Sequence, residues 1–233
     1  MRHSGNMTPQ RYQKLRQVLD SRQPDLTVLL DNVHKPHNFS AILRSCDAVG
    51  VFEAHAVWQD PTLRPSRLTS SGTGKWVGVR THPDIDSAAA ALHGLGFRLI
   101  AAHPEYGALD YREIDYTCPT ALVLGAELQG LSERVLEHTE CRVCVPMMGM
   151  AASLNVSVAA ATILFEAQRQ RAAANLYAES RLEQGRYEQT LFEWAHPVVA
   201  RYCRRHGFDY PELDGDGEIA GPLPRAGRSR RLG

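Results

Sequence analysis

The segment VPMMGMAASLNVSVAAATILFEAQRQR, residues 145–171, decides the fold. It opens with an apolar loop of three methionines and one glycine, a composition suited to a nucleoside or thioether-type ligand. Ser153, Asn155 and Ser157 then stand at the entrance of a helix expected over residues 159–177. Capping that helix requires only one such side chain, so the surplus of hydrogen-bonding groups favours a functional role.

Outward from this segment, apolar runs of strand length alternate with amphipathic stretches of helix length. Thr8 and Pro9 have the residue types that cap and start a first helix. Strands alternating with helices predict an α/β fold with a mainly parallel sheet. The expected strands cover residues 26–33, 53–58, 97–102, 120–124 and 142–145. The expected later helices cover residues 39–49, 84–93, 132–138, 159–177 and 183–205, with a loop over 60–78.

Length and composition narrow the class of protein. The 233 residues, 43% hydrophobic and 22% charged, fit one ordinary domain with appendages. No apolar window long enough for a membrane span is present, and the N-terminus does not resemble a secretion signal, so we expect a cytoplasmic protein. Cys141 and Cys144 form a C-x-x-C without a second ligand pair, so no metal is expected.

Charge is distributed unevenly although the formal net charge is zero. Residues 1–22 carry five cations against Asp20, which gives +4, and residues 225–233 carry four arginines without an acid. Basic ends on a balanced body can bind a phosphate backbone locally. A general excess of arginine, 23 Arg against 3 Lys, is the plainer alternative.

Two further segments hold polar residues where predicted strands end. After residues 26–33, Asn38 can cap the next helix, and Arg44 follows among apolar neighbours. Arginine is suited to bidentate binding of phosphate. After residues 120–124, Gly125 permits close approach of a ligand to the backbone, and Ser132 can cap a short helix. Ligands of α/β sheets bind just beyond strand ends, so these segments mark a candidate site.

Together the three segments closely resemble the signature blocks of the SPOUT methyltransferases, specifically their SpoU or TrmH branch. The blocks read NFSAILR (38–44), LGAELQGLS (124–132) and VPMMGMAASLNVS (145–157), in the order and spacing of that branch. The resemblance covers about residues 8–177. The strings VHKPHN (33–38) and DYREIDYT (110–117) are similar to those of members that methylate guanosine 18 of tRNA.

The resemblance implies a C-terminal trefoil knot in the α/β fold, flanked by N- and C-terminal helical extensions, and a homodimer. It implies S-adenosylmethionine as the cofactor and methylation of a ribose 2′-hydroxyl in tRNA. The domains are then a basic helix at 1–22, a methyltransferase domain at 23–177, a helix at 178–206 and a mobile tail at 207–233.

The resemblance also assigns site residues by motif position. Cofactor contacts through the backbone are implied near Ala102, Gly125, Val145, Pro146 and Leu154. The implied reaction centre consists of Arg44 as the catalytic arginine with Asn38, Glu127, Ser153 and Asn155. RNA contacts are expected from Arg11, Lys14 and Arg22 of the basic first helix and from Arg169 and Arg171.

The role of Arg44 remains open at this level. Family members are proposed to use this arginine as the general base, but deprotonating a guanidinium at neutral pH costs about 8 kcal/mol. Either the base form arises only when RNA is bound, or Arg44 clamps a phosphate and aligns the hydroxyl.

Three other functions compete with this interpretation. Methylation of a ribosomal RNA ribose would use the same motifs. A non-catalytic RNA-binding module is disfavoured because Asn38, Arg44, Glu127 and Asn155 are all present. A dinucleotide-dependent oxidoreductase is disfavoured because the G-x-G-x-x-G fingerprint is missing.

Overall fold

A computed structural model describes residues 7–58, 73–104, 107–126 and 130–224. The chain divides into two compact units. One consists of Arg22–Arg181, and the other combines the residues up to Ser21 with those from Leu182 onward. The N-terminal and C-terminal extensions, which the sequence analysis treats as separate parts, therefore belong to one unit.

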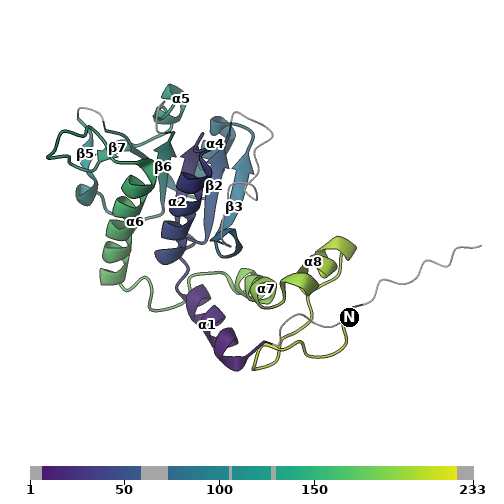
Figure 1. Ribbon diagram of the computed structural model, residues 1–233. Helices are drawn as coiled ribbons and strands as arrows, with labels where there is room; N and C mark the ends of the chain where they lie inside the picture. The colour runs from purple at the N-terminus through teal and green to yellow at the C-terminus, as the bar shows by residue number, and fades with distance from the viewer. Residues whose placement is uncertain (1–6, 59–72, 105–106, 127–129, 225–233) are drawn as a thin grey trace, which may run out of the picture. The chain divides into compact units, whose positions relative to one another are not determined.

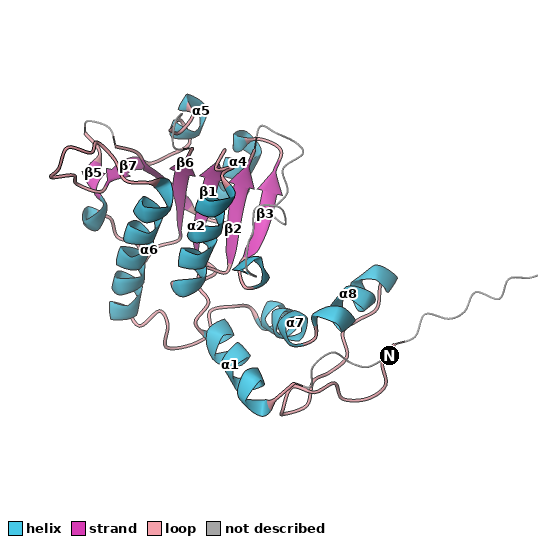
Figure 2. Ribbon diagram, viewed as in Figure 1, coloured by secondary structure: helices cyan, strands magenta, loops and turns pink. Residues whose placement is uncertain are grey.

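The larger unit is built on a seven-stranded sheet in which every ladder is parallel (Figure 2). The strand order is β3-β2-β1-β6-β4-β7-β5. The strands are β1 (Leu26–Asp31), β2 (Glu53–Val57), β3 (Gly78–His82), β4 (Arg98–Ala102), β5 (Leu109–Asp110), β6 (Thr120–Gly125) and β7 (Cys141–Cys144). The predicted α/β fold with a mainly parallel sheet is confirmed.

Helices cover both faces of this sheet. α2 (Pro36–Ala48) and α6 (Val156–Ala173) lie side by side on one face (Figure 1), where Phe39, Ile42 and Leu164 join the core. α4 (Ile85–Gly94) and the short α5 (Glu133–Leu136) cover the other. All six residues of β1 are buried, because a central parallel strand loses both faces to helices.

The smaller unit contains α1 (Pro9–Asp20), α7 (Gln184–Ala195) and α8 (Pro197–His206). As expected, the Thr8 hydroxyl accepts a hydrogen bond from the Arg11 amide at 3.2 Å, and Pro9 begins the helix. The prediction of one helix over 183–205 is wrong. Pro197 starts a new helix because it has no amide hydrogen to continue the preceding one.

Residues 207–224 fold back within the smaller unit. Gly207, at φ 67°, ends α8, and Leu213 pairs with Ile219 in an antiparallel bridge. The His196 ring lies 2.7 Å from the Gly217 carbonyl oxygen. Residues 207–224 thus make contacts within the smaller unit where a mobile tail was expected, and residues 225–233 lie outside the described part of the chain.

Two short strands escaped the sequence analysis. β3 lies at the sheet edge with a largely exposed sequence, and β5 has only two residues, so neither shows an apolar run. Two short 3₁₀ turns, Thr73–Lys75 and Tyr111–Glu113, complete the unit. Among the described helices, none combines the length and apolarity that crossing a bilayer requires.

Candidate functional site

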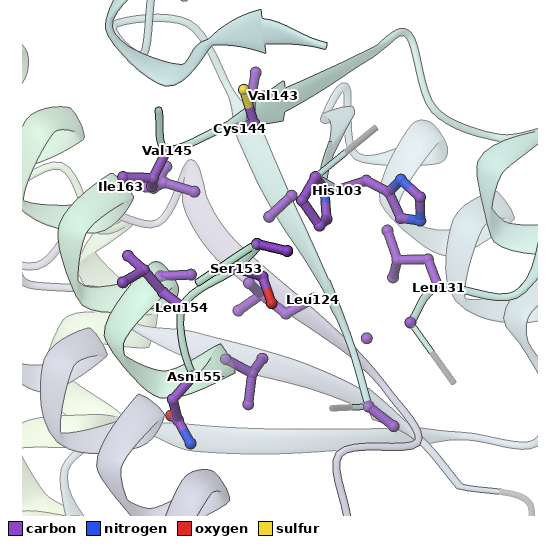
Figure 3. Close-up of a pocket in the computed structure, with 18 residues that line it drawn as sticks. His103, Leu124, Leu131, Val143, Cys144, Val145, Ser153, Leu154, Asn155 and Ile163 are labelled. Atoms are coloured by element: carbon purple, nitrogen blue, oxygen red, sulfur yellow. The ribbon is translucent and has the colours of Figure 1, made fainter. Parts of the chain in front are cut away.

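A cavity of about 380 Å³ lies at the carboxyl ends of β4, β6 and β7. This volume falls within the roughly 300–1,000 Å³ typical of small-molecule sites. Figure 3 shows Val145, Leu154 and Ile163 on one side of the cavity and His103 and Leu131 on the other. The lining comprises residues 102–104, 124–126, 130–131, 143–145, 152–156, 159 and 163.

Most residues assigned to the site from the sequence lie in this lining. The structure places Ala102, Gly125, Val145, Ser153, Leu154 and Asn155 there. Pro146 follows Val145 but is not among the lining residues. Glu127 lies outside the described residues.

Gly125 occupies a position where the backbone folds back on itself. A Cβ atom at Gly125 would overlap the carbonyl group of Gly130. The Gly130 amide donates to the Ala126 carbonyl at 2.9 Å, and Gly130 adopts a left-handed φ of 66°. The two glycines therefore allow β6 to turn tightly and present its backbone to the cavity.

Two asparagines from distant parts of the sequence meet beside the cavity. The Asn155 side-chain amide donates to Oδ1 of Asn38 at 3.2 Å, across 117 positions of sequence. Oδ1 of Asn155 caps α6 by accepting from the Ser157 amide at 2.8 Å. Asn38 is buried on α2, so this contact joins the helix of the first signature block to the third block.

The start of α2 differs from the prediction. We expected Asn38 to cap a helix over 39–49, but the helix begins at Pro36 with Lys35 as its N-cap. Proline suits the first helical position because its φ is preset and its missing amide hydrogen is not needed there. Asn38 therefore lies inside the first turn, and its side chain is available to Asn155.

Arg44 lies on α2 with its side chain exposed. Its neighbours Ile42, Leu43 and Cys46 are buried, so α2 presents the guanidinium on its solvent side. An exposed guanidinium can donate two parallel hydrogen bonds to the oxygens of one phosphate.

Two arginines expected to contact RNA are fully buried instead. Arg22 donates to Oδ1 of Asp47 at 2.5 Å and to the Val51 carbonyl at 3.1 Å. Arg171 donates to the carbonyl of Tyr116 at 2.8 Å and to Oδ1 of Asp25 at 2.7 Å. The RNA assignment of Arg22 and Arg171 is therefore corrected, because their charges are used inside the fold.

The other three predicted RNA contacts are exposed. Arg11 and Lys14 lie on the surface of α1 in the smaller unit. Arg169 lies on α6 and donates to both carboxylate oxygens of Glu166, at 2.9 and 2.7 Å. Hydrogen bonding from Arg169 lowers the pKa of Glu166. Arg169 thus faces solvent although Arg171, two residues later, is enclosed.

Two sets of candidate functional residues were not predicted from the sequence. His103 lines the cavity directly after β4, so the strand-end rule applied to the Ala102 strand could have identified it. On α8, exposed Arg201, Arg204 and Arg205 share a helix with Tyr202 and no acid. The Tyr202 ring lies 4.6 Å from that of His206, between centroids. The lack of acidic residues over 197–206 was a usable signal of a basic surface.

The sequence is similar to those of known proteins over most of its length. The sequence matches the SpoU rRNA Methylase family over residues 25–165 and the family's C-terminal region, "SpoU, rRNA methylase, C-terminal", over residues 169–222. It is 46% identical over 215 residues to the tRNA (guanosine(18)-2′-O)-methyltransferase of Escherichia coli (strain K12), covering 91% of this chain and 94% of that protein.

Solved structures of similar proteins share the fold. The tRNA modifying enzyme TrmH/SpoU of A. aeolicus matches with a TM-score of 0.75 and 39% identity, over 82% of this chain and 97% of that one. The SpoU methyltransferase AviRb of Streptomyces viridochromogenes, solved in complex with the cofactor AdoMet, matches with a TM-score of 0.56 and 30% identity. That match covers 66% of this chain and 62% of AviRb.

Proposed function

The chain belongs to the SpoU rRNA Methylase family, and we infer from this membership that it methylates the ribose 2′-hydroxyl of guanosine 18 in tRNA with S-adenosylmethionine. One observation carries the inference. The family's second and third signature blocks line one cavity, and the first block is hydrogen-bonded to it through Asn38 and Asn155.

The cavity suits the cofactor. Leu124, Leu131, Val143 and Ile163 supply apolar walls against which an adenine ring can pack. The backbone at Ala102, Gly125, Val145 and Leu154 offers hydrogen bonds at the same surface. We propose Pro146, which follows Val145, as a further contact. When bound, S-adenosylmethionine supplies a methyl group activated by its sulfonium.

The chain's own residues must position the ribose and assist loss of its proton. A hydroxyl is a poor nucleophile until its proton leaves. Asn38 and Asn155 are held together at 3.2 Å and can orient the ribose, and Ser153 lies on the same cavity wall. Glu127 belongs to the second signature block, and we propose it as a further polar group of the reaction centre.

We assign Arg44 as a phosphate clamp rather than as the general base. Its side chain is exposed on α2, where the planar guanidinium can donate two hydrogen bonds to a phosphate. Clamping the phosphate next to the target ribose would align the hydroxyl with the methyl donor. Alignment of this kind can supply several kcal/mol of the barrier reduction.

Exposed cations provide surfaces for the rest of the tRNA. Arg11 and Lys14 of α1, with the arginines of α8, would contact phosphates through the smaller unit. Arg169 would do so from the larger one. Binding through phosphates implies a strong dependence on salt concentration. Since tRNA is the substrate, we place the enzyme in the cytoplasm.

The finer architecture follows the family. We propose that the C-terminal part of the larger unit forms a trefoil knot around the cofactor site, and that the enzyme is a homodimer. Val158 and Phe165, about half exposed and seven residues apart, leave an apolar stripe on α6 that a second copy could cover. Met148 and Met150 are fully exposed beside it in the sequence.

One experiment tests the activity. The protein is incubated with radiolabelled S-adenosylmethionine and unmodified tRNA transcript, and the modified nucleotide is mapped. We expect one methyl group per tRNA at the ribose of guanosine 18, and none when the transcript already carries that methyl group. A ribosomal RNA fragment is incubated in parallel. Labelling of that fragment and not of the tRNA would assign another substrate, and labelling of neither RNA would contradict the proposed activity.

A further inference from the structure

The carboxylate of Asp31 lies beside the second signature block, residues 124–132. Asp31 ends β1, is 3% exposed, and stands opposite Gly125 in the register of β1 and β6. Its Oδ2 accepts from the Ser132 hydroxyl at 2.9 Å and from the Ser132 amide at 3.2 Å. Its Oδ1 accepts from the Asn32 side-chain amide at 2.9 Å. Both oxygens of a buried carboxylate are thus engaged by donors.

The bonds to Ser132 fix one wall of the cavity. Gly125 and Ala126 enter this wall from β6, and Gly130 and Leu131 return from it just before Ser132. The returning backbone packs against Gly125 so closely that no Cβ fits there. Gly130 and Leu131 are therefore held between Gly125 of β6 and the contact of Ser132 with Asp31. Ser132 also caps α5 by accepting from the Val135 amide at 3.4 Å.

The bond to Asn32 fixes the path toward α2. Asn32 adopts a left-handed φ of 56°, which is uncommon for a residue other than glycine. The backbone amide of Asn32 donates to the Val57 carbonyl at 2.9 Å, and the backbone carbonyl oxygen of Asn32 lies 2.8 Å from Nδ1 of His34. This turn leads directly into α2, which carries Asn38.

We propose that Asp31 is a positioning residue that holds Gly130 and Leu131 against Gly125, and the turn at Asn32, in the arrangement that binds S-adenosylmethionine. The proposal rests on the proposed function. A carboxylate accepts at both oxygens, and donors approach both of them here. An amide accepts at only one oxygen, so Asp31→Asn must rearrange the contact with Ser132 or with Asn32, and a mismatched buried polar group is costly.

The test measures S-adenosylmethionine binding to the full-length protein by calorimetry, without RNA, for Asp31→Asn and Ser132→Ala. We expect Asp31→Asn to raise the dissociation constant at least tenfold. Ser132→Ala keeps the backbone donor and should raise it about threefold. Because the two groups act through one contact, the double variant should bind no more weakly than Asp31→Asn alone. In turnover, Ser132→Ala should raise KM for S-adenosylmethionine and leave kcat unchanged.

Asp47→Asn is the matched control. Asp47 also accepts a hydrogen bond from a buried side chain, because the Arg22 guanidinium donates to its Oδ1 at 2.5 Å. Asp47 lies near the C-terminal end of α2, whereas Asn38 lies in the first turn of that helix. We expect this variant to melt earlier than the wild type while its affinity for S-adenosylmethionine stays within twofold.

Several outcomes would overturn the role of Asp31. Wild-type affinity in folded Asp31→Asn, or a loss no larger than that of Asp47→Asn, would make Asp31 a general stabilising residue. If Asp31→Asn does not fold, wild-type affinity in Ser132→Ala would still refute the proposal. Additive losses in the double variant would refute the shared contact. A wild-type protein that fails to bind S-adenosylmethionine would contradict the proposed function itself, which separates the two failures.

Discussion

The carboxyl and amino edges of the central sheet use polar residues in opposite ways. At the carboxyl edge, β4, β6 and β7 end in a cavity lined by apolar residues together with His103, Ser153 and Asn155. At the amino edge, Arg22 and Arg171 are fully buried and bind carbonyl groups that precede the strands. The first edge leaves groups available to a ligand, whereas the second satisfies them internally.

The amino edge shows what a buried arginine can do for stability. Arg171 reaches the carbonyl of Cys118 at 3.1 Å and that of Asp25 at 3.1 Å, so it joins α6 to the entrances of β6 and β1. A guanidinium has five donors in a fixed plane, which suits several acceptors at once. Arg44, in contrast, is exposed, so residue type alone does not distinguish a buried structural arginine from one in the reaction centre.

The largest effect is expected from replacing Arg44, the exposed arginine of this comparison. Arg44→Ala should lower the rate of methyl transfer about 1,000-fold, because an aligning charge at the target phosphate is lost. Its affinity for S-adenosylmethionine and its melting temperature should stay near wild type. Single-turnover kinetics with saturating cofactor and tRNA measure the first, and calorimetry measures the second.

Arg44→Lys sharpens the same test. Lysine keeps the charge but loses the planar pair of donors, so a bidentate clamp should still fail. A near-normal rate in Arg44→Lys would count against the clamp. Weakened cofactor binding in Arg44→Ala, with unchanged turnover per bound complex, would remove the arginine from the reaction centre.

The second expected effect concerns the amino edge. Arg171→Met should lower the free energy of unfolding by about 3 kcal/mol, because it leaves buried carbonyl acceptors without a donor. Asp25 keeps one partner, since Arg181 also donates to its Oδ1 at 2.8 Å. The folded fraction should bind S-adenosylmethionine normally. Urea denaturation gives the free energy of unfolding. An unchanged denaturation midpoint would show that Arg171 does not stabilise the fold.

This contrast also explains how far the sequence could predict the site. Apolar strand runs and the signature blocks predicted the sheet and the lining at Gly125, Val145 and Leu154. They could not predict that Arg171 is buried while Arg169 is exposed, because α6 has apolar residues on several faces. The contact between Asn38 and Asn155 depends on how α2 packs against α6, and no local pattern encodes that packing.

Some errors were avoidable from the sequence. Pro197 stands inside the stretch that was predicted as one helix, and proline is disfavoured in a helix interior. Pro36 likewise indicated an earlier start of α2 than the one predicted. The edge strand β3 was a harder case, because its exposed residues show neither alternation nor an apolar run.

A smaller effect is expected from a polar pair within the sheet that serves no described part of the cavity. Nδ1 of His55 lies 2.9 Å from Nε2 of His82. Burial, followed by the proximity of His82 and Arg80, lowers the pKa of His55 to about 4. The folded state therefore resists protonation, and stability present above the unfolded-state pKa of about 6.5 is lost as the pH falls toward 4.

The expected loss in unfolding free energy between pH 7 and pH 4 from this pair is about 2 kcal/mol. His55→Gln should flatten that part of the stability profile, as measured by denaturation at several pH values. Cofactor affinity of the folded His55→Gln variant at pH 7 should match the wild type. Weaker cofactor binding would show that the pair belongs functionally to the carboxyl edge.

The smallest expected effect separates two arginines of one helix. Arg169→Ala removes an exposed cation that is paired with Glu166 on the surface of α6. Surface pairs of this kind contribute little, so the free energy of unfolding should change by less than about 0.5 kcal/mol. Affinity for tRNA should fall about threefold, and the slope of log affinity against log salt should decrease by about one if Arg169 contacts a phosphate. Arg171→Met should have the opposite effects: it should lower the free energy of unfolding and leave the salt slope unchanged. Comparing the two variants therefore tests whether α6 carries one RNA contact, Arg169, and one buried structural arginine, Arg171. Identical profiles for the two variants would refute that division.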